Sequence, residues 1–189
     1  MKKTILTILL IAGVSITNYA QDIAKLDTQK SVLYWMGSNF LGFGNHHGTV
    51  KFKEGNLILT NSKITGGSFI IDMNTIANVD GGYNKGLVDH LKNGDFFDVF
   101  FYPTAKLDIT NVVYKDKTHI KVKANLTIKT TTKPIEFDAE LDYDKKEMAT
   151  SFSINRTLWN IVYASKFVTD MKDKMISENI GFKVQLSFE

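Results

Sequence analysis

The stretch from His119 to Tyr143, HIKVKANLTIKTTTKPIEFDAELDY, decides the fold of this chain. Apolar residues occupy every second position from Ile120 to Ile128, and again from Ile135 to Tyr143. Successive side chains of a β-strand point to opposite faces, so each run is predicted to be a strand with one apolar and one wet face. The link 129–134 is short enough for a hairpin.

The charges within these two runs indicate a register for the hairpin. If Leu126 lies opposite Phe137, the same pairing brings Lys123 to Glu140, so that apolar residues meet apolar residues and cations meet anions. Opposite charges that face each other across two strands contribute about 0.2–1 kcal/mol per pair. This register is therefore the one predicted.

Further segments alternate in the same way, and the whole pattern is typical of an all-β protein. A turn is expected at Glu54-Gly55 and a bulge or bend at Gly66-Gly67. Helical patterns are confined to 85–92 and 170–175, so no strand–helix–strand rhythm exists and an antiparallel sandwich or barrel is predicted. The other expected strands are 31–36, 48–53, 55–60, 64–72, 106–113, 148–154 and 180–188.

An aromatic cluster lies in the stretch His90–Lys106, HLKNGDFFDVFFYPTAK. Five rings fall in the seven residues from Phe96 to Tyr102. Each ring has about 150–250 Å² of surface to bury, so this segment is expected to lie against something apolar. We interpret it as a segment that plugs or flanks one end of a hollow barrel.

The first twenty residues are predicted to be a secretory signal peptide, which leaves residues 21–189 as one domain. Lys2 and Lys3 precede the apolar run Ile5–Ile16, and Ala20 is a small residue at the expected cleavage position. A membrane anchor is the alternative, but the run is shorter than the roughly 20 residues that span a bilayer. The domain is therefore expected to be periplasmic or secreted. The chain has no Cys, so packing alone holds it together.

The charge balance argues against a nucleic-acid partner. The formal net charge of the whole chain is +3, and without residues 1–20 there are 21 basic and 20 acidic residues. A nucleic-acid-binding protein needs a clustered basic face, whereas the basic residues here alternate with acids.

Few side chains suggest chemistry, and neither a metal nor a cofactor is predicted. His46 and His47 are adjacent, so on a strand they point to opposite faces and cannot grip one zinc ion, which needs three or four ligands. His47 or His90 with an aspartate would be the acid–base pair of an enzyme. Arg156, the only Arg, could fork onto a phosphate or carboxylate head group, or could stack on Trp159 or pair with an acid.

A set of short motifs resembles the YceI-like family in the same order along residues 24–188. Thr130 and Asn160 depart from the family, which usually has Gly at these turns. The motifs are Trp35-Met36-Gly37, 47–52 (HGTVKF), 67–72 (GSFIID), His90-Leu91-Lys92, 95–99 (DFFDV), 102–105 (YPTA), 126–129 (LTIK), 132–134 (TKP) and 154–159 (INRTLW).

This resemblance implies a single antiparallel, extended lipocalin-like barrel of about eight strands with one or two short helices. It also implies a long amphiphile, such as a polyisoprenoid or a fatty-acid-derived amide, enclosed in the barrel, and it supplies no catalytic motif. A barrel of this size can either fill itself with side chains or hold one small ligand. On pattern alone, the two outcomes are equally open.

We therefore predict an exported protein that sequesters or carries a long-chain lipid or polyisoprenoid in an apolar tunnel, without chemistry of its own. An enzyme acting on a lipid in the barrel and a solid-core structural or interaction module are the alternatives. The oligomeric state stays open, with an edge-paired homodimer as one option, and so does the partner that delivers the lipid. The predicted ligand-binding residues are Trp35, Phe69, Ile71, Leu91, Phe97, Leu126, Ile128, Phe137, Phe152 and Ile154, with His47 and Arg156 at the head group.

Overall fold

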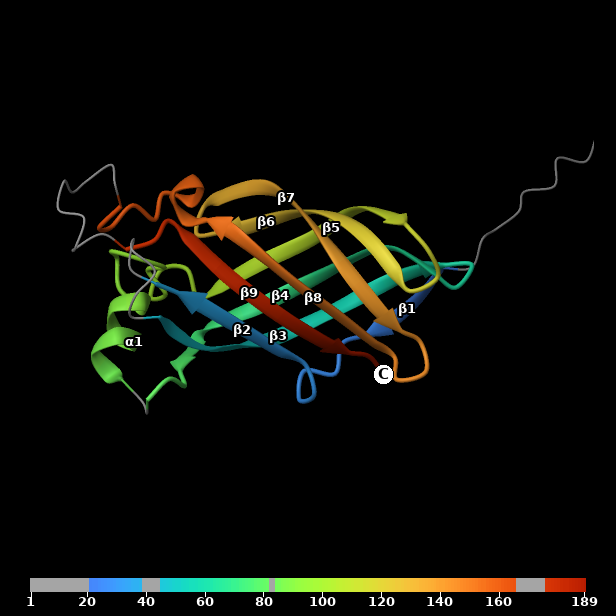
Figure 1. The fold of residues 1–189 in the computed structure, drawn as a ribbon, viewed down its shortest axis with the longest axis horizontal. Coiled ribbons are helices and arrows are strands. Elements are labelled where there is room, and N and C mark those ends of the chain that lie inside the picture. Colours follow the sequence, from blue (N-terminus) through green and yellow to red (C-terminus); the bar gives the residue numbers. More distant parts are fainter. Residues whose placement is uncertain (1–20, 39–44, 82–83, 166–175) are drawn as a thin grey trace, which may run out of the picture.

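The computed structural model describes residues 21–38, 45–81, 84–165 and 176–189. Within these ranges a single antiparallel sheet curls into an elongated barrel (Figure 1). The strands are β1 (Gln21–Lys25), β2 (Val32–Gly37), β3 (His46–Thr60), β4 (Lys63–Asn78), β5 (Thr104–Tyr114), β6 (His119–Ile128), β7 (Thr131–Asp142), β8 (Glu147–Asn155) and β9 (Asn179–Ser187). Helix α1 (Lys85–Lys92) and the 3-10 helix η1 (Arg156–Trp159) lie at one end of the barrel.

Strand β3 closes the barrel. The strands from β4 to β9 pair in sequence order, β9 pairs with β2, and β3 pairs with both β2 and β4. Strand β1 pairs with the C-terminal part of β3, from Gln21 opposite Thr60 to Lys25 opposite Asn56. The predicted all-β class and the closed antiparallel barrel of eight strands are confirmed for the described residues.

The hairpin β6–β7 forms as predicted, but its register is wrong by four residues. Val122, and not Leu126, lies opposite Phe137, because the turn consists of Lys129 and Thr130 alone and β7 already begins at Thr131. Lys129 adopts the left-handed conformation, with φ 55°. An even shift leaves every side chain on its predicted face, which is why the fold prediction survives the error.

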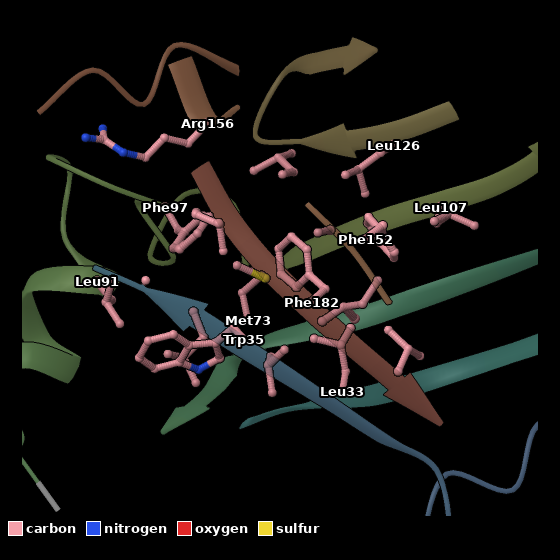
Figure 2. Close-up of a pocket in the computed structure, with 18 of the residues that line it drawn as sticks. Leu33, Trp35, Met73, Leu91, Phe97, Leu107, Leu126, Phe152, Arg156 and Phe182 are labelled. Atoms are coloured by element: carbon pink, nitrogen blue, oxygen red, sulfur yellow. The ribbon is translucent and has the colours of Figure 1, made fainter. Parts of the chain in front are cut away.

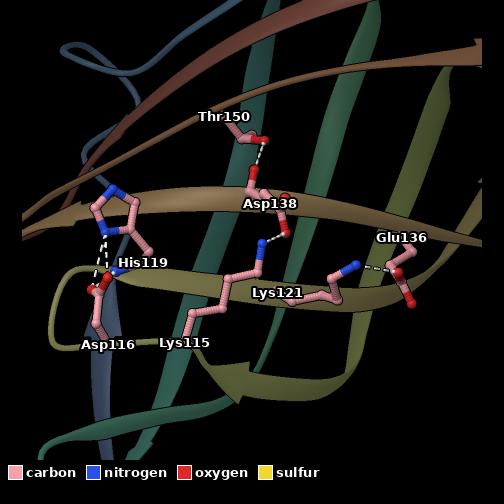
Figure 3. Close-up of polar contacts among 7 residues, drawn as sticks. All are labelled: Lys115, Asp116, His119, Lys121, Glu136, Asp138 and Thr150. Carbon is pink, nitrogen blue, oxygen red and sulfur yellow. Dashed lines mark hydrogen bonds and ion pairs between the residues drawn. The ribbon is translucent and has the colours of Figure 1, made fainter.

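Opposite charges do pair on the outer face of this hairpin, although with other partners (Figure 3). Lys121 lies 2.8 Å from Glu136, and Lys115 lies 2.8 Å from Asp138. The hydrogen bond from Lys121 lowers the pKa of the Glu136 carboxyl. These pairs are exposed, so each contributes little to the stability of the fold.

The expected turn at Glu54-Gly55 is wrong, since β3 runs on through both residues. A β-carbon on Gly55 would lie 2.4 Å from the Phe69 ring, so the glycine permits a close approach between β3 and β4. The strand instead turns at Asn61 and Ser62, whose φ angles of 52° and 61° suit a two-residue hairpin.

The bulge expected near Gly66 is confirmed. Gly66 lies opposite Ile58 and Ile64 lies opposite Leu59, so one residue of β4 between them has no direct partner.

Helix α1 spans the predicted residues 85–92. The Asn84 side chain accepts a hydrogen bond of 3.0 Å from the Leu87 backbone N–H and so caps its first turn. No helix among the described residues is long and apolar enough to cross a membrane. The predicted helix at 170–175 and the predicted signal peptide lie outside the described residues.

The interior of the barrel has two unlike halves. Near the β3–β4 and β5–β6 turns, side chains from opposite walls meet and fill the space. Those fully buried there are Leu26, Leu57, Ile64, Ile120, Val122 and Leu141. Toward α1 the walls do not meet.

Candidate functional site

A cavity of about 560 Å³ occupies the half of the barrel next to α1 (Figure 2). Its wall is almost entirely apolar and includes side chains from each of the strands β2 to β9. Side chains along the wall, strand by strand, include Leu33, Val50, Phe69, Leu107, Leu126, Phe137, Met148 and Phe182. Because the volume lies within the usual range of small-molecule sites, the barrel is not packed solid from end to end.

Helix α1 and the loop after it cover one end of the cavity. Leu91 of the helix and Phe97 of the loop both line the wall. Backbone hydrogen bonds fix the loop on the helix end, from the Phe97 N–H to the Leu91 carbonyl at 3.1 Å and from the Val99 N–H to the Lys92 carbonyl at 2.9 Å. This segment therefore flanks the cavity at one end of the barrel, which is one of the two arrangements predicted for it.

The expectation that this aromatic segment lies against something apolar is wrong for two of its five rings. Phe96 is buried and Phe97 lines the cavity, but Phe100 is 87% exposed and Phe101 is 70% exposed. Asp98 has a left-handed backbone, with φ 49°, which reverses the chain between the two ring pairs. The first pair consequently faces the interior and the second faces solvent.

The polar side chains on the cavity wall gather at the α1 end. Ser38, His46, Ser177 and Asn179 line the wall there, at the ends of β2, β3 and β9, whereas Thr150 lies deeper. Among the described residues, the cavity thus has one polar end, which we call its mouth, and a long apolar interior.

The histidine at this mouth is His46, and not the predicted His47. Gly48, Val50 and Phe52 of β3 are buried, so strand alternation turns His46 inward and His47, which is exposed, outward. His46 lies 2.6 Å from Asp80. Burial opposes ionisation of Asp80, but the hydrogen bond with His46 and several backbone donors prevail and lower its pKa to about 2. The carboxylate therefore holds the imidazole in place at the mouth.

His90, the other histidine considered for chemistry, is not on the cavity wall. Its ring packs edge-on against Phe96 and Tyr163, with centroids 5.2 and 4.6 Å away, and its Nε2 lies 3.4 Å from the Asp95 carboxylate. These contacts bind the α1 loop to the segment that follows η1.

Arg156 is fully buried, and its guanidinium holds the chain together at this end of the barrel. It donates to the carbonyls of Ser177, Ile161 and Ile176 at 3.0, 2.6 and 3.2 Å, and lies over the Phe96 ring at 5.5 Å. Burial lowers the pKa of the guanidinium, and the charge of Glu178 opposes that shift. Figure 2 shows the group directed away from the apolar side chains. We therefore assign it to structure and not to a head group or a stack on Trp159.

The structure brings ten of the twelve predicted site residues to the cavity wall, among them Arg156. Ile154 is buried in the core beside the cavity, and His47 lies outside the barrel. The sequence reasoning missed several wall residues whose inward position the strand alternation already indicated. These are Leu33, Val50, Phe52, Leu107, Phe182, Val184 and Leu186.

Comparison with protein families matches residues 25–188 to the YceI-like domain. A UPF0312 protein of Vibrio cholerae is 30% identical over 145 residues, which are 74% of this chain and 74% of that protein. A UPF0312 protein of Pseudomonas putida is 28% identical over 152 residues, covering 78% of this chain and 77% of its own.

Solved structures share the fold at low sequence identity. BcnA of Burkholderia cenocepacia superposes with a TM-score of 0.70 at 17% identity, over 85% of this chain and 98% of that one. A protein of Saccharophagus degradans, described as a polyisoprenoid binding domain, has a TM-score of 0.60 at 13% identity, over 91% and 99% of the two chains.

Replacement of Arg156 by Met should destabilise the protein by about 3 kcal/mol or more, because three buried carbonyls lose their donor. Arg156→Lys should recover part of this loss, since an ammonium cannot reach all three acceptors in the fixed geometry of a guanidinium. Urea unfolding gives the free energies, with the exposed Lys117→Met as the control. A loss below about 1 kcal/mol for Arg156→Met would show that these bonds do not hold the barrel end.

Proposed function

Since the chain belongs to the YceI-like domain family, we propose that it binds and carries one long amphiphile, a polyisoprenoid or a fatty-acid-derived lipid. The observation that carries this proposal is the cavity of about 560 Å³, which all eight barrel strands line with apolar side chains. The description of the Saccharophagus degradans relative as a polyisoprenoid binding domain supports the ligand class.

The tail of the amphiphile lies in the apolar interior and the head group at the mouth. Burial of each methylene contributes about 0.8 kcal/mol, so a long chain binds without many polar contacts. His46, Ser177 and Asn179 lie on the wall at the α1 end, where hydroxyl, amide and imidazole groups meet a polar head. We therefore assign the head-group contact to these three residues, in place of the predicted His47 and Arg156.

The protein carries the amphiphile without transforming it. The enzyme alternative needed His47 or His90 beside the ligand, but His47 faces outward and His90 packs between aromatic rings away from the cavity wall. The imidazole at the mouth, that of His46, is engaged with Asp80 at 2.6 Å. The position of this imidazole at the end of the cavity suits a role in orienting the head group of the ligand.

We further propose that residues 1–20 direct export and are then removed, because a basic start and an apolar run precede a small residue at position 20. N-terminal sequencing of the exported protein should read from Gln21. A start at Met1 in the exported fraction would contradict the proposal.

Organic extraction of the purified protein, followed by mass spectrometry, tests the function directly. About one equivalent of a long-chain amphiphile is expected per barrel. Leu107→Asn places a polar group on the cavity wall and should weaken retention roughly tenfold, since an amide in an apolar site costs about 1–3 kcal/mol.

Val113→Asn is the matched control, because this residue is on the same strand but is 49% exposed on the outer face. It should retain lipid as the wild type does. The proposal fails if the wild-type extract holds no amphiphile and the protein shows no saturable binding of prenyl or acyl chains. Equal loss of lipid in both variants would show that the cavity wall is not the binding surface.

A further inference from the structure

We propose that the α1 end of the barrel docks on the surface of a lipid bilayer, with Phe100 and Phe101 inserted between the lipids. This inference rests on the proposed function, because the bilayer is where a long-chain amphiphile resides. The two adjacent rings are 87% and 70% exposed and lie edge to face, with centroids 5.0 Å apart. Phe has no polar atom to keep in water, so both rings favour an apolar partner.

The ring pair is held in place and does not swing on a loose loop. The Phe101 and Tyr102 backbone N–H groups both donate to the Asp98 carbonyl, at 3.1 and 2.9 Å, and the Asp98 N–H donates to the Asn93 carbonyl at 2.8 Å. Phe97 of the same loop lines the cavity, so the loop that carries the exposed rings also forms part of the cavity wall.

Further large apolar side chains are exposed around the same end. They belong to β2, to η1 and to the segment that follows η1, which lie at the α1 end of the barrel (Figure 1). A broad and flat apolar partner contacts such a set at once, and a bilayer has that form. The residues are Met36, Leu158, Val162 and Tyr163, which are 40–55% exposed.

Two lysines lie beside the ring-bearing loop. Lys129 donates to the Phe96 carbonyl at 3.4 Å and lies over the Tyr102 ring at 6.0 Å, and Lys92 donates to the Asn74 carbonyl at 2.6 Å. Each ammonium has three N–H donors, so further donors can face a phosphate. Aromatic rings flanked by lysines are typical of segments that lie in the membrane interface.

Flotation of the full mature protein with phosphatidylcholine vesicles tests the docking. The wild type should float with the vesicles, and Phe100→Ser/Phe101→Ser should lower the partition coefficient by about tenfold or more. Ile23→Ser/Val113→Ser, which removes exposed apolar side chains at the opposite end of the barrel, should float as the wild type does. Binding should persist at high salt, because the rings contribute most of it.

Binding of a detergent-solubilised amphiphile separates this inference from the proposed function. The ring variant should bind it as the wild type does, since neither ring is on the cavity wall. A wild type that binds the amphiphile but does not float overturns the docking and leaves the function standing. Binding that high salt abolishes, equal flotation of the ring variant, or a dimer that this variant dissociates would each overturn it as well.

The geometry also points to Phe69 as the residue that fixes the longest chain the cavity accepts. Its ring lines the cavity and lies edge-on to Phe52, with centroids 6.2 Å apart. On its other side it covers Gly55, where an added β-carbon would be 2.4 Å from the ring and 3.2 Å from Leu26 of the filled half. Phe69 therefore lies between the cavity and the filled half of the barrel, and this inference too rests on the proposed function.

Two opposite substitutions test this role against a homologous series of straight-chain fatty acids. Phe69→Ala should move the preferred chain to greater length, and Gly55→Ala should push the ring into the cavity and move it to shorter length. Each methylene gained or lost changes the affinity about fourfold. If Phe69→Ala does not fold, Phe69→Leu gives the same shift to a smaller degree.

Val113→Ala, on the outer face of the barrel, is the control and should leave the length preference unchanged. Failure of the wild type to bind any chain would count against the proposed function itself. Binding with an unchanged length preference in both the Phe69 and the Gly55 variants would overturn the role of Phe69 alone.

Discussion

The whole account depends on one geometrical constraint: a closed barrel of alternating strands puts half of its side chains inside, and their sizes decide whether they meet. At the β1 end they do, where Leu26, Leu57 and Ile120 are among the side chains that fill the section. At the α1 end they stop short of one another and leave about 560 Å³. The filled half stabilises the fold without disulfides, and the other half can therefore stay open.

At the open half, buried backbone carbonyls need hydrogen-bond donors, which apolar side chains cannot supply. Arg156 satisfies three backbone carbonyls there, and Trp159 donates from its buried Nε1 to the Leu126 carbonyl at 3.1 Å. His46 and Asp80 add a contact of 2.6 Å at the mouth. The loop after α1 then divides its rings, with Phe97 facing the cavity and Phe100 facing solvent. One end of the molecule thus combines the ligand mouth with the most exposed rings.

Strand alternation predicts which face of a strand each side chain occupies, and the sequence was sufficient for that. The strand faces and most wall residues follow from a period of two, and helix α1 follows from the helical pattern of residues 85–92. It was insufficient wherever geometry depends on distant contacts. The β6–β7 register follows from the left-handed Lys129, and Gly55 remains in a strand because Phe69 covers it. Arg156 looked like a head-group ligand since its carbonyl partners lie up to 21 residues away in the chain.

The most direct test of the hollow half is a crystal structure with a long-chain fatty acid that carries bromine on its terminal carbon. The account predicts an anomalous bromine peak inside the barrel, beside Phe69 and Met148 at the deep end of the cavity wall. The carboxylate should lie near His46 at the mouth. A bromine peak on the outer surface, with the interior closed by its own side chains, would contradict it.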